Sequence, residues 1–66
     1  MKNKLKVARA EKNITQEELA NEIKVSRQTI NAIETGKYVP STILALKMAL
    51  YFGMKVEELF ILEETD

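Results

Sequence analysis

Cysteine and histidine are both absent from this sequence of 66 residues. Their absence excludes disulfide bonds, thiolate nucleophiles, the usual zinc ligands and the imidazole group on which most acid–base catalysts rely. Three pairs of adjacent glutamates remain, namely Glu17 and Glu18, Glu57 and Glu58, and Glu63 and Glu64. Neighbouring side chains on a helix point about 100° apart, and no partner for these pairs is evident, so they are interpreted as solvated charges. We therefore expect no enzymatic activity, no metal ion and no cofactor.

The sequence also has little proline and glycine, with one and two residues respectively, and no long hydrophobic run. Residues 1–4 are not followed by the apolar segment of a secretory signal, and the longest stretch with few charges, residues 38–46, is too short and too polar to span a bilayer. We expect a cytoplasmic protein without a membrane partner. A chain of this length forms one domain, residues 1–66, and buries only about 60% of its unfolded surface, so further burial against a partner subunit would help it fold.

An excess of charge of one sign is lacking too, because ten basic and ten acidic residues give a formal net charge of zero. A neutral chain does not bind nucleic acid by bulk electrostatic attraction alone. The charges are nevertheless unevenly distributed. The basic residues Lys2, Lys4, Lys6, Arg9 and Lys12 open the chain, and the acidic residues Glu57, Glu58, Glu63, Glu64 and Asp66 close it. We therefore expect one end of the molecule to face phosphate groups and the other to face away.

Helical periodicity and helix caps are what the sequence does contain, and they predict an all-α fold of five helices. The first helix begins near Leu5 and ends near Asn13. Thr15 and Glu18 form a T-x-x-E capping box for the second helix, which ends near Lys24.

The third helix is predicted over residues 27–34. Ser26 is placed to cap its start, and Gly36 is placed to end it. The second and third helices are therefore separated by only a few residues.

The fourth helix is apolar almost all round, since Lys47 is the only charged residue between positions 43 and 52. It follows a cap at Ser41 or Thr42 and ends before Gly53. We expect one of its faces to lie in the core, so that the remaining apolar residues need another cover. The expected core stripe is Ala45, Leu46, Ala49 and Phe52.

The apolar residues left over predict an interface between two copies of the chain. A short last helix over residues 56–60 leads into an apolar run at residues 60–62, which the acidic tail follows. A symmetric homodimer would cover this run together with the rest of the fourth helix. The predicted interface residues are Leu44, Leu50, Tyr51, Leu59, Ile61 and Leu62.

The apolar positions of the second and third helices suit a steep crossing. Ala20 is small enough to let the helices pass closely, and Val25, Ile30 and Ile33 fill the angle between them. Here the sequence resembles the Cro and phage-repressor family of helix-turn-helix regulators. The segments that match the family's pattern are residues 15–20 (TQEELA), 25–30 (VSRQTI), 33–37 (IETGK), 40–41 (PS) and 58–60 (ELF).

The resemblance covers nearly the whole chain and implies the five-helix fold of lambda-repressor-like DNA-binding domains, as a compact, stand-alone member. Such members dimerise, and a small strand from the chain ends can be added. One departure is Lys24, because the family usually has glycine or another residue tolerant of positive φ at this turn, so we expect mild strain there. Arg9 and Glu34 match a pair that links the first helix to the third, and we assign them to structure.

The resemblance also implies which residues bind DNA. In the family, the N-terminal end of the third helix enters the major groove. Arginine suits guanine, the amides of glutamine and asparagine suit adenine, and threonine or alanine can meet the methyl group of thymine. The residues implied to read bases are Arg27, Gln28, Thr29, Asn31 and Ala32, and those implied to bind phosphates are Gln16, Ser26, Lys37 and Tyr38.

The function that the resemblance implies is a transcriptional regulator, in particular a repressor that binds a palindromic operator in double-stranded DNA as a homodimer. The alternative is an antitoxin or another protein-interaction module of the same fold. No sensor domain and no small-molecule ligand are evident. On an arbitrary helix the same polar residues would be solvated surface, and it is the full pattern that favours a DNA-reading role.

Overall fold

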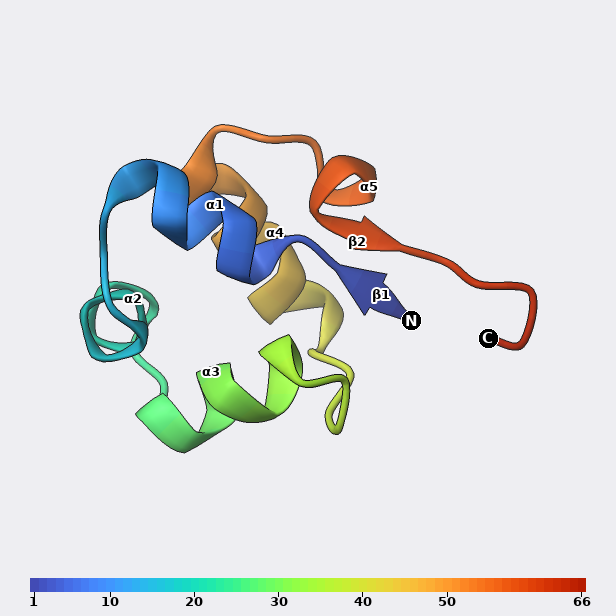
Figure 1. Cartoon of the computed structure of the whole chain (residues 1–66), viewed down its shortest axis with the longest axis horizontal. Helices are drawn as coiled ribbons and strands as arrows, with labels where there is room; N and C mark the ends of the chain where they lie inside the picture. Colours follow the sequence, from blue (N-terminus) through green and yellow to red (C-terminus); the bar gives the residue numbers. More distant parts are fainter.

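The computed structural model describes residues 1–66 and contains five helices and a two-stranded sheet (Figure 1). The five expected helices are all present, so the all-α class is confirmed, and the two chain ends add the small sheet. None of the helices combines the length and the apolar character that crossing a membrane requires. In chain order the elements are β1 (Lys2–Asn3), α1 (Leu5–Lys12), α2 (Gln16–Ile23), α3 (Arg27–Glu34), α4 (Thr42–Phe52), α5 (Val56–Leu59) and β2 (Phe60–Ile61).

Side-chain caps start α2, α3 and α4, as the sequence predicts. The Glu18 N–H donates to Thr15 Oγ1 at 3.0 Å and the Thr15 N–H donates to Glu18 Oε1 at 2.9 Å, which completes the capping box of α2. Ser26 Oγ accepts from the Thr29 N–H at 3.1 Å, and Ser41 caps α4 in the same way. Each cap satisfies a backbone donor that the helix leaves free and contributes about 1 kcal/mol.

The turn between α2 and α3 depends on one residue in the left-handed conformation. Lys24 has φ 59° and ψ 49°, and the following Val25 N–H donates to the Ala20 carbonyl oxygen at 3.0 Å. A side chain in this conformation costs roughly 1–2 kcal/mol, so the strain expected at Lys24 is present. Ala20 is only 2% exposed and belongs to the core cluster, so a larger side chain there has to displace its neighbours.

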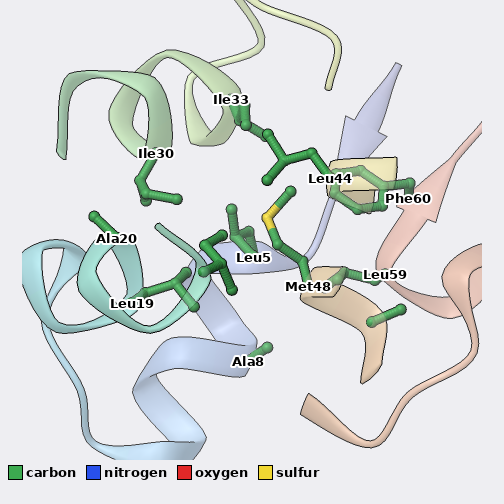
Figure 2. Packing of buried hydrophobic residues seen from close by; sticks show 12 residues of the cluster. Leu5, Ala8, Leu19, Ala20, Ile30, Ile33, Leu44, Met48, Leu59 and Phe60 are labelled. Carbon is green, nitrogen blue, oxygen red and sulfur yellow. The ribbon is translucent and has the colours of Figure 1, made fainter. Parts of the chain in front are cut away.

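The hydrophobic core takes residues from all five helices, and Figure 2 shows their side chains converging between the ribbons. Ile30 and Ile33 of α3 point into this core toward the side chains of α1, α2 and α4 (Figure 2). Their packing fixes the position of α3 relative to the other helices. The side chains with less than 2% exposure are Leu5, Leu19, Ile30, Ile33, Met48 and Leu59.

The face that α4 turns to the core differs from the predicted one. Leu46 is 53% exposed, so its assignment to the core stripe is wrong, whereas the assignment of Ala49 is confirmed. Because α4 is apolar on nearly every side, its own periodicity does not select a face, and packing against the neighbouring helices decides it. The buried residues of α4 are Leu44, Met48 and Ala49, and the half-buried ones are Ala45, Tyr51 and Phe52.

The two chain ends lie side by side (Figure 1). Strand β1 pairs antiparallel with β2, with Lys2 opposite Ile61. The terminal ammonium group of Met1 lies 2.8 Å from Asp66 Oδ1 and 3.2 Å from Glu63 Oε1. The expectation that the basic beginning and the acidic end face in opposite directions is therefore wrong for the two chain ends, because the sheet and the ion pairs of the Met1 ammonium group hold them together.

Candidate nucleic-acid interface

The start of α3 presents a row of polar side chains on the surface. Ile30 and Ile33 are at most 1% exposed, which fixes the rotation of α3 about its axis. Arg27, Gln28 and Asn31 consequently lie on the exposed side of the helix. We call these three residues the polar row; they carry donors and acceptors of the kind that match base edges.

The other predicted contacts surround the polar row. Thr29 is half-buried beside the exposed helix cap, and its Oγ1 lies 2.9 Å from Ser26 Oγ, so both hydroxyl groups already have a partner. Ala32 is half-buried on the next turn, and its carbonyl oxygen accepts from the N–H groups of Lys37 and Tyr38 at 2.9 and 3.2 Å. These bonds fold the loop after α3 back onto the helix and leave the side chains of Lys37 and Tyr38 exposed.

Gln16 connects the start of α2 to α3. Its Nε2 donates to Asn31 Oδ1 and to Glu34 Oε1, each at 3.2 Å. Gln16 and the polar row together line a surface hollow of about 350 Å³. The structure thus brings Gln16, for which a phosphate contact remains a prediction, into contact with a predicted base-reading residue.

A largely buried ion pair lies behind the polar row. Arg9 Nε donates to Glu34 Oε2 at 2.6 Å, and Arg9 Nη2 donates to Glu34 Oε1 at 3.1 Å. The two side chains are 15% and 5% exposed, and Arg9 Nη1 donates to the Ile14 carbonyl oxygen at 2.9 Å. The hydrogen bonds to Glu34 raise the pKa of Arg9 above its ordinary value. The expected link between α1 and α3 is confirmed, and its two parallel bonds fix the geometry of both side chains.

Asn3 has a structural role that the sequence pattern did not reveal. Its Nδ2 donates to the Ile33 carbonyl oxygen at 2.9 Å, and its Oδ1 accepts from the Leu5 N–H at 3.1 Å. The beginning of the chain is thereby tied to the end of α3. Asparagine is a frequent capping residue, so its position two residues before Leu5 could have indicated the bond to the Leu5 N–H, whereas no pattern in the sequence indicates the bond to Ile33.

The predicted dimer interface includes two residues that belong to the core of their own chain. Leu59 is completely buried and Leu44 is 9% exposed, so their assignment to an intermolecular interface is wrong. Both are covered within the single chain, where they join the same core cluster. Of the remaining predicted residues, Leu50 and Leu62 are exposed, and Tyr51 and Ile61 are half-buried.

An exposed apolar stripe runs along α4, and of its residues only Leu50 was part of the predicted interface. Ile43, Leu46 and Leu50 are 69%, 53% and 83% exposed, and their spacing of three and four residues places them on one side of the helix. Val39, just before the helix, is 63% exposed. We call Ile43, Leu46 and Leu50 the α4 stripe; it leaves three large aliphatic side chains in water.

Comparison with known proteins agrees with this architecture. The sequence model of the helix-turn-helix family matches residues 5–59, from the first residue of α1 to the last residue of α5. The chain is 59% identical to an HTH-type transcriptional regulator of Methanocaldococcus jannaschii over 100% of both chains, and 53% identical to one of Bacillus subtilis over 97% of each. It is also 34% identical to the cryptic phage CTXphi transcriptional repressor of Vibrio cholerae, over 97% of this chain and 58% of the repressor.

Proposed function

The chain belongs to the helix-turn-helix family of DNA-binding transcriptional regulators, and from this premise we propose that it is a repressor that binds a palindromic operator as a homodimer. The observation that carries the proposal is the polar row. Arg27, Gln28 and Asn31 stand on the exposed side of a helix whose opposite side is locked into the core, so the row can enter a groove without disturbing the fold.

In the proposed complex the start of α3 lies in the major groove. Arg27 is the first residue of the helix, and its guanidinium group can donate two hydrogen bonds to O6 and N7 of guanine. Gln28 follows it and reads an adjacent base, while Asn31 reads from the next turn. The half-buried Thr29 and Ala32 approach thymine methyl groups.

Contacts to phosphate would come from the residues around the polar row. Lys37 supplies a cation in the loop after α3, Ser26 and Tyr38 supply hydroxyl groups, and Gln16 lies at the start of α2. Because the chain carries no net charge, the salt-dependent part of the affinity depends on a few local cations and not on a diffuse positive field.

The repressor role is supported by the relative from Vibrio cholerae, which is named a transcriptional repressor. The simplest mechanism of repression is occupation of promoter DNA, since steric exclusion of the polymerase requires only affinity for the site.

The α4 stripe supports the homodimer. Covering apolar surface is favourable by about 25 cal/mol per Å², and a two-fold axis lets one stripe cover the same stripe of a second copy. Leu62, which is 80% exposed, and the half-buried Tyr51 and Ile61 add apolar surface beyond the stripe. A symmetric pair would present its two polar rows to successive major grooves about 34 Å apart, which requires a palindromic site.

Footprinting of the purified protein on the DNA upstream of its own gene tests DNA recognition. We expect one protected segment that contains two inverted half-sites with centres about 10 base pairs apart. An absence of any protected segment, together with no enrichment from a random duplex library, would contradict the proposal.

Sedimentation equilibrium tests the homodimer. We expect a dimer at tens of micromolar for the wild type and a folded monomer for Leu50→Lys, because a buried lysine without a partner disrupts an apolar interface. Glu17→Lys also introduces a lysine, but at an exposed position of α2 outside the stripe, and it should remain dimeric. A monomeric wild type, or a Leu50→Lys variant that stays dimeric, would show that the α4 stripe is not the interface.

A further inference from the structure

The Glu34 carboxylate accepts three hydrogen bonds, all from nitrogen donors. Two come from Arg9 at 2.6 and 3.1 Å, and the third comes from Gln16 Nε2 at 3.2 Å. A carboxylate paired with a guanidinium group has only acceptors to offer. The atom of Gln16 that faces Glu34 must therefore be the amide nitrogen.

This requirement fixes the orientation of the Gln16 side chain. Turned over, the amide would place its oxygen against a carboxylate whose side chain is only 5% exposed, and two acceptors without a shared hydrogen repel each other. With Nε2 directed at Glu34, the second hydrogen of the same group is directed at Asn31 Oδ1, at 3.2 Å. A side-chain amide has two donor hydrogens, so both donors of Gln16 are used.

The orientation of the Gln16 amide determines the orientation of the Asn31 amide. Its Oδ1 faces Gln16, so the group that it offers to a ligand on the exposed side of α3 is Nδ2, with two donor hydrogens. Bidentate pairing with adenine needs a donor and an acceptor turned toward the base together. Asn31 turns its acceptor inward and its donors outward.

We infer that Glu34, acting through Gln16, sets Asn31 to read a base edge that presents acceptors, either guanine through O6 and N7 or thymine through O4. The inference rests on the proposed function and deepens it, because an unconstrained asparagine pairs with adenine. Gln16 and Glu34 are positioning residues, and because both amide hydrogens of Gln16 are used, this role replaces the phosphate contact proposed for the Gln16 side chain. The Arg9–Glu34 ion pair thus takes part in the choice of base as well as in joining α1 to α3.

Selection of bound duplexes from a random library, followed by titration of single-base variants, tests the inference. Comparison of the wild type with Asn31→Ala identifies the operator position that Asn31 contacts, because that position alone loses its preference. At this position the wild type should prefer guanine or thymine over cytosine, which presents only a donor, by about fivefold or more.

Gln16→Glu is the decisive variant because it removes the bridging donor, and the carboxylate of Glu34 repels the new carboxylate from the bridging position. Asn31 is then released and can turn Oδ1 and Nδ2 together toward the base, so the preferred base should change to adenine. Asn21→Asp adds the same charge at an exposed position of α2 outside these hydrogen bonds and should keep the wild-type preference. An unchanged preference in Gln16→Glu, or a wild-type preference for adenine or cytosine, would overturn the inference.

NMR spectroscopy of the free protein separates this inference from the proposed function. We expect nuclear Overhauser contacts from the Gln16 amide hydrogens to the side chains of Asn31 and Glu34, and Asn31 amide hydrogens that exchange freely with water. Asn31 amide hydrogens that are protected from exchange, together with Gln16 amide hydrogens that exchange freely, would overturn the inference even if the protein binds DNA. A wild type that selects no DNA but shows the expected contacts would refute the proposed function and leave the amide orientation established.

Discussion

The polar row of α3 and the α4 stripe are both exposed, yet they are supported in different ways. Behind the row, Arg9, Glu34 and Gln16 form a continuous series of hydrogen bonds that ends on Asn31. On the core-facing side of α4, opposite the stripe, lie buried apolar side chains such as Met48. Directional bonds hold polar groups at set angles, which reading a base requires, whereas a rigid apolar helix offers area and shape, which suits contact with a second copy.

Truncating side chains on the two sides of α4 should give the largest difference in the free energy of unfolding. Met48→Ala removes a completely buried side chain and should lower the free energy of unfolding by about 2–5 kcal/mol. Leu46→Ala removes a side chain that is 53% exposed and should change it by about 0.5 kcal/mol or less in the monomer. Urea denaturation in the Leu50→Lys background, where dimer dissociation does not contribute, measures both. Equal losses would mean that α4 turns another face to the core.

Enlarging Ala20 tests whether the row is positioned by the crossing of α2 and α3. Added methylene groups at this tight contact should cost about 1–3 kcal/mol, so Ala20→Leu should lower the melting temperature and weaken operator binding together. Ala10→Leu, at an exposed position of α1, is the matched control and should melt close to the wild type. A wild-type melting temperature for Ala20→Leu would place Ala20 outside the crossing.

Two substitutions separate base reading from phosphate contact within the proposed DNA surface. Arg27→Ala should reduce discrimination between operator and random DNA by about 1–3 kcal/mol, because a bidentate contact to guanine is lost. Lys37→Ala should weaken both complexes equally and reduce the salt slope by about two for a dimer. Titration of both duplexes at several salt concentrations distinguishes the two effects. If Arg27→Ala weakens both complexes in proportion, Arg27 contacts phosphate and the bases are read elsewhere on α3.

Relieving the backbone strain at Lys24 should change the free energy of unfolding by less than Met48→Ala or Ala20→Leu does. Lys24→Gly removes the clash of a β-carbon in the left-handed conformation, and we expect a gain of about 0.5–1 kcal/mol after the entropy of glycine is subtracted. Glu22→Gly, an exposed position inside α2, should instead lose about 1 kcal/mol. Thermal denaturation of the pair measures the difference, and a loss of stability in Lys24→Gly would contradict the strain.

The contact between the chain ends should depend on pH, and this is the smallest of the expected effects. The hydrogen bond to Asp66 raises the pKa of the Met1 amino group above 8.0, and the same bond lowers the pKa of Asp66 below 3.8. The contribution of Asp66 is present above its ordinary pKa and is lost as the pH falls through the lowered one. The contribution of the amino group is present below its ordinary pKa and is lost as the pH rises through the raised one. The NMR chemical shifts of the Lys2 and Ile61 backbone amides should therefore be constant between the lowered pKa of Asp66 and the raised pKa of the amino group, and should change outside this range. Chemical shifts that change only in the middle of this range would contradict the ion pair.

The sequence could predict the helix-turn-helix unit because each of its helices carries a cap and a single apolar side. Thr15 and Ser26 fix the starts of α2 and α3, and the spacing of Ile30 and Ile33 fixes the exposed side of α3. The same reasoning fails for α4, whose apolar residues leave no preferred side. It fails also for the bridge from Gln16 to Asn31, because a sequence shows that both residues are polar and not that folding brings them within 3.2 Å of each other.

The pairing of β1 with β2 makes the chain almost a closed ring. The Met1 nitrogen and an Asp66 carboxylate oxygen are 2.8 Å apart, so a short linker would join the ends, and new ends opened between α4 and α5 would give a circular permutant with every helix intact. In that permutant β2 and β1 become the two arms of one hairpin, and a contact that now spans nearly the whole sequence becomes local. The contacts between α4 and α5 become the long-range ones in exchange, so the permutant should assemble its elements in a different order while it presents the same row of side chains on α3.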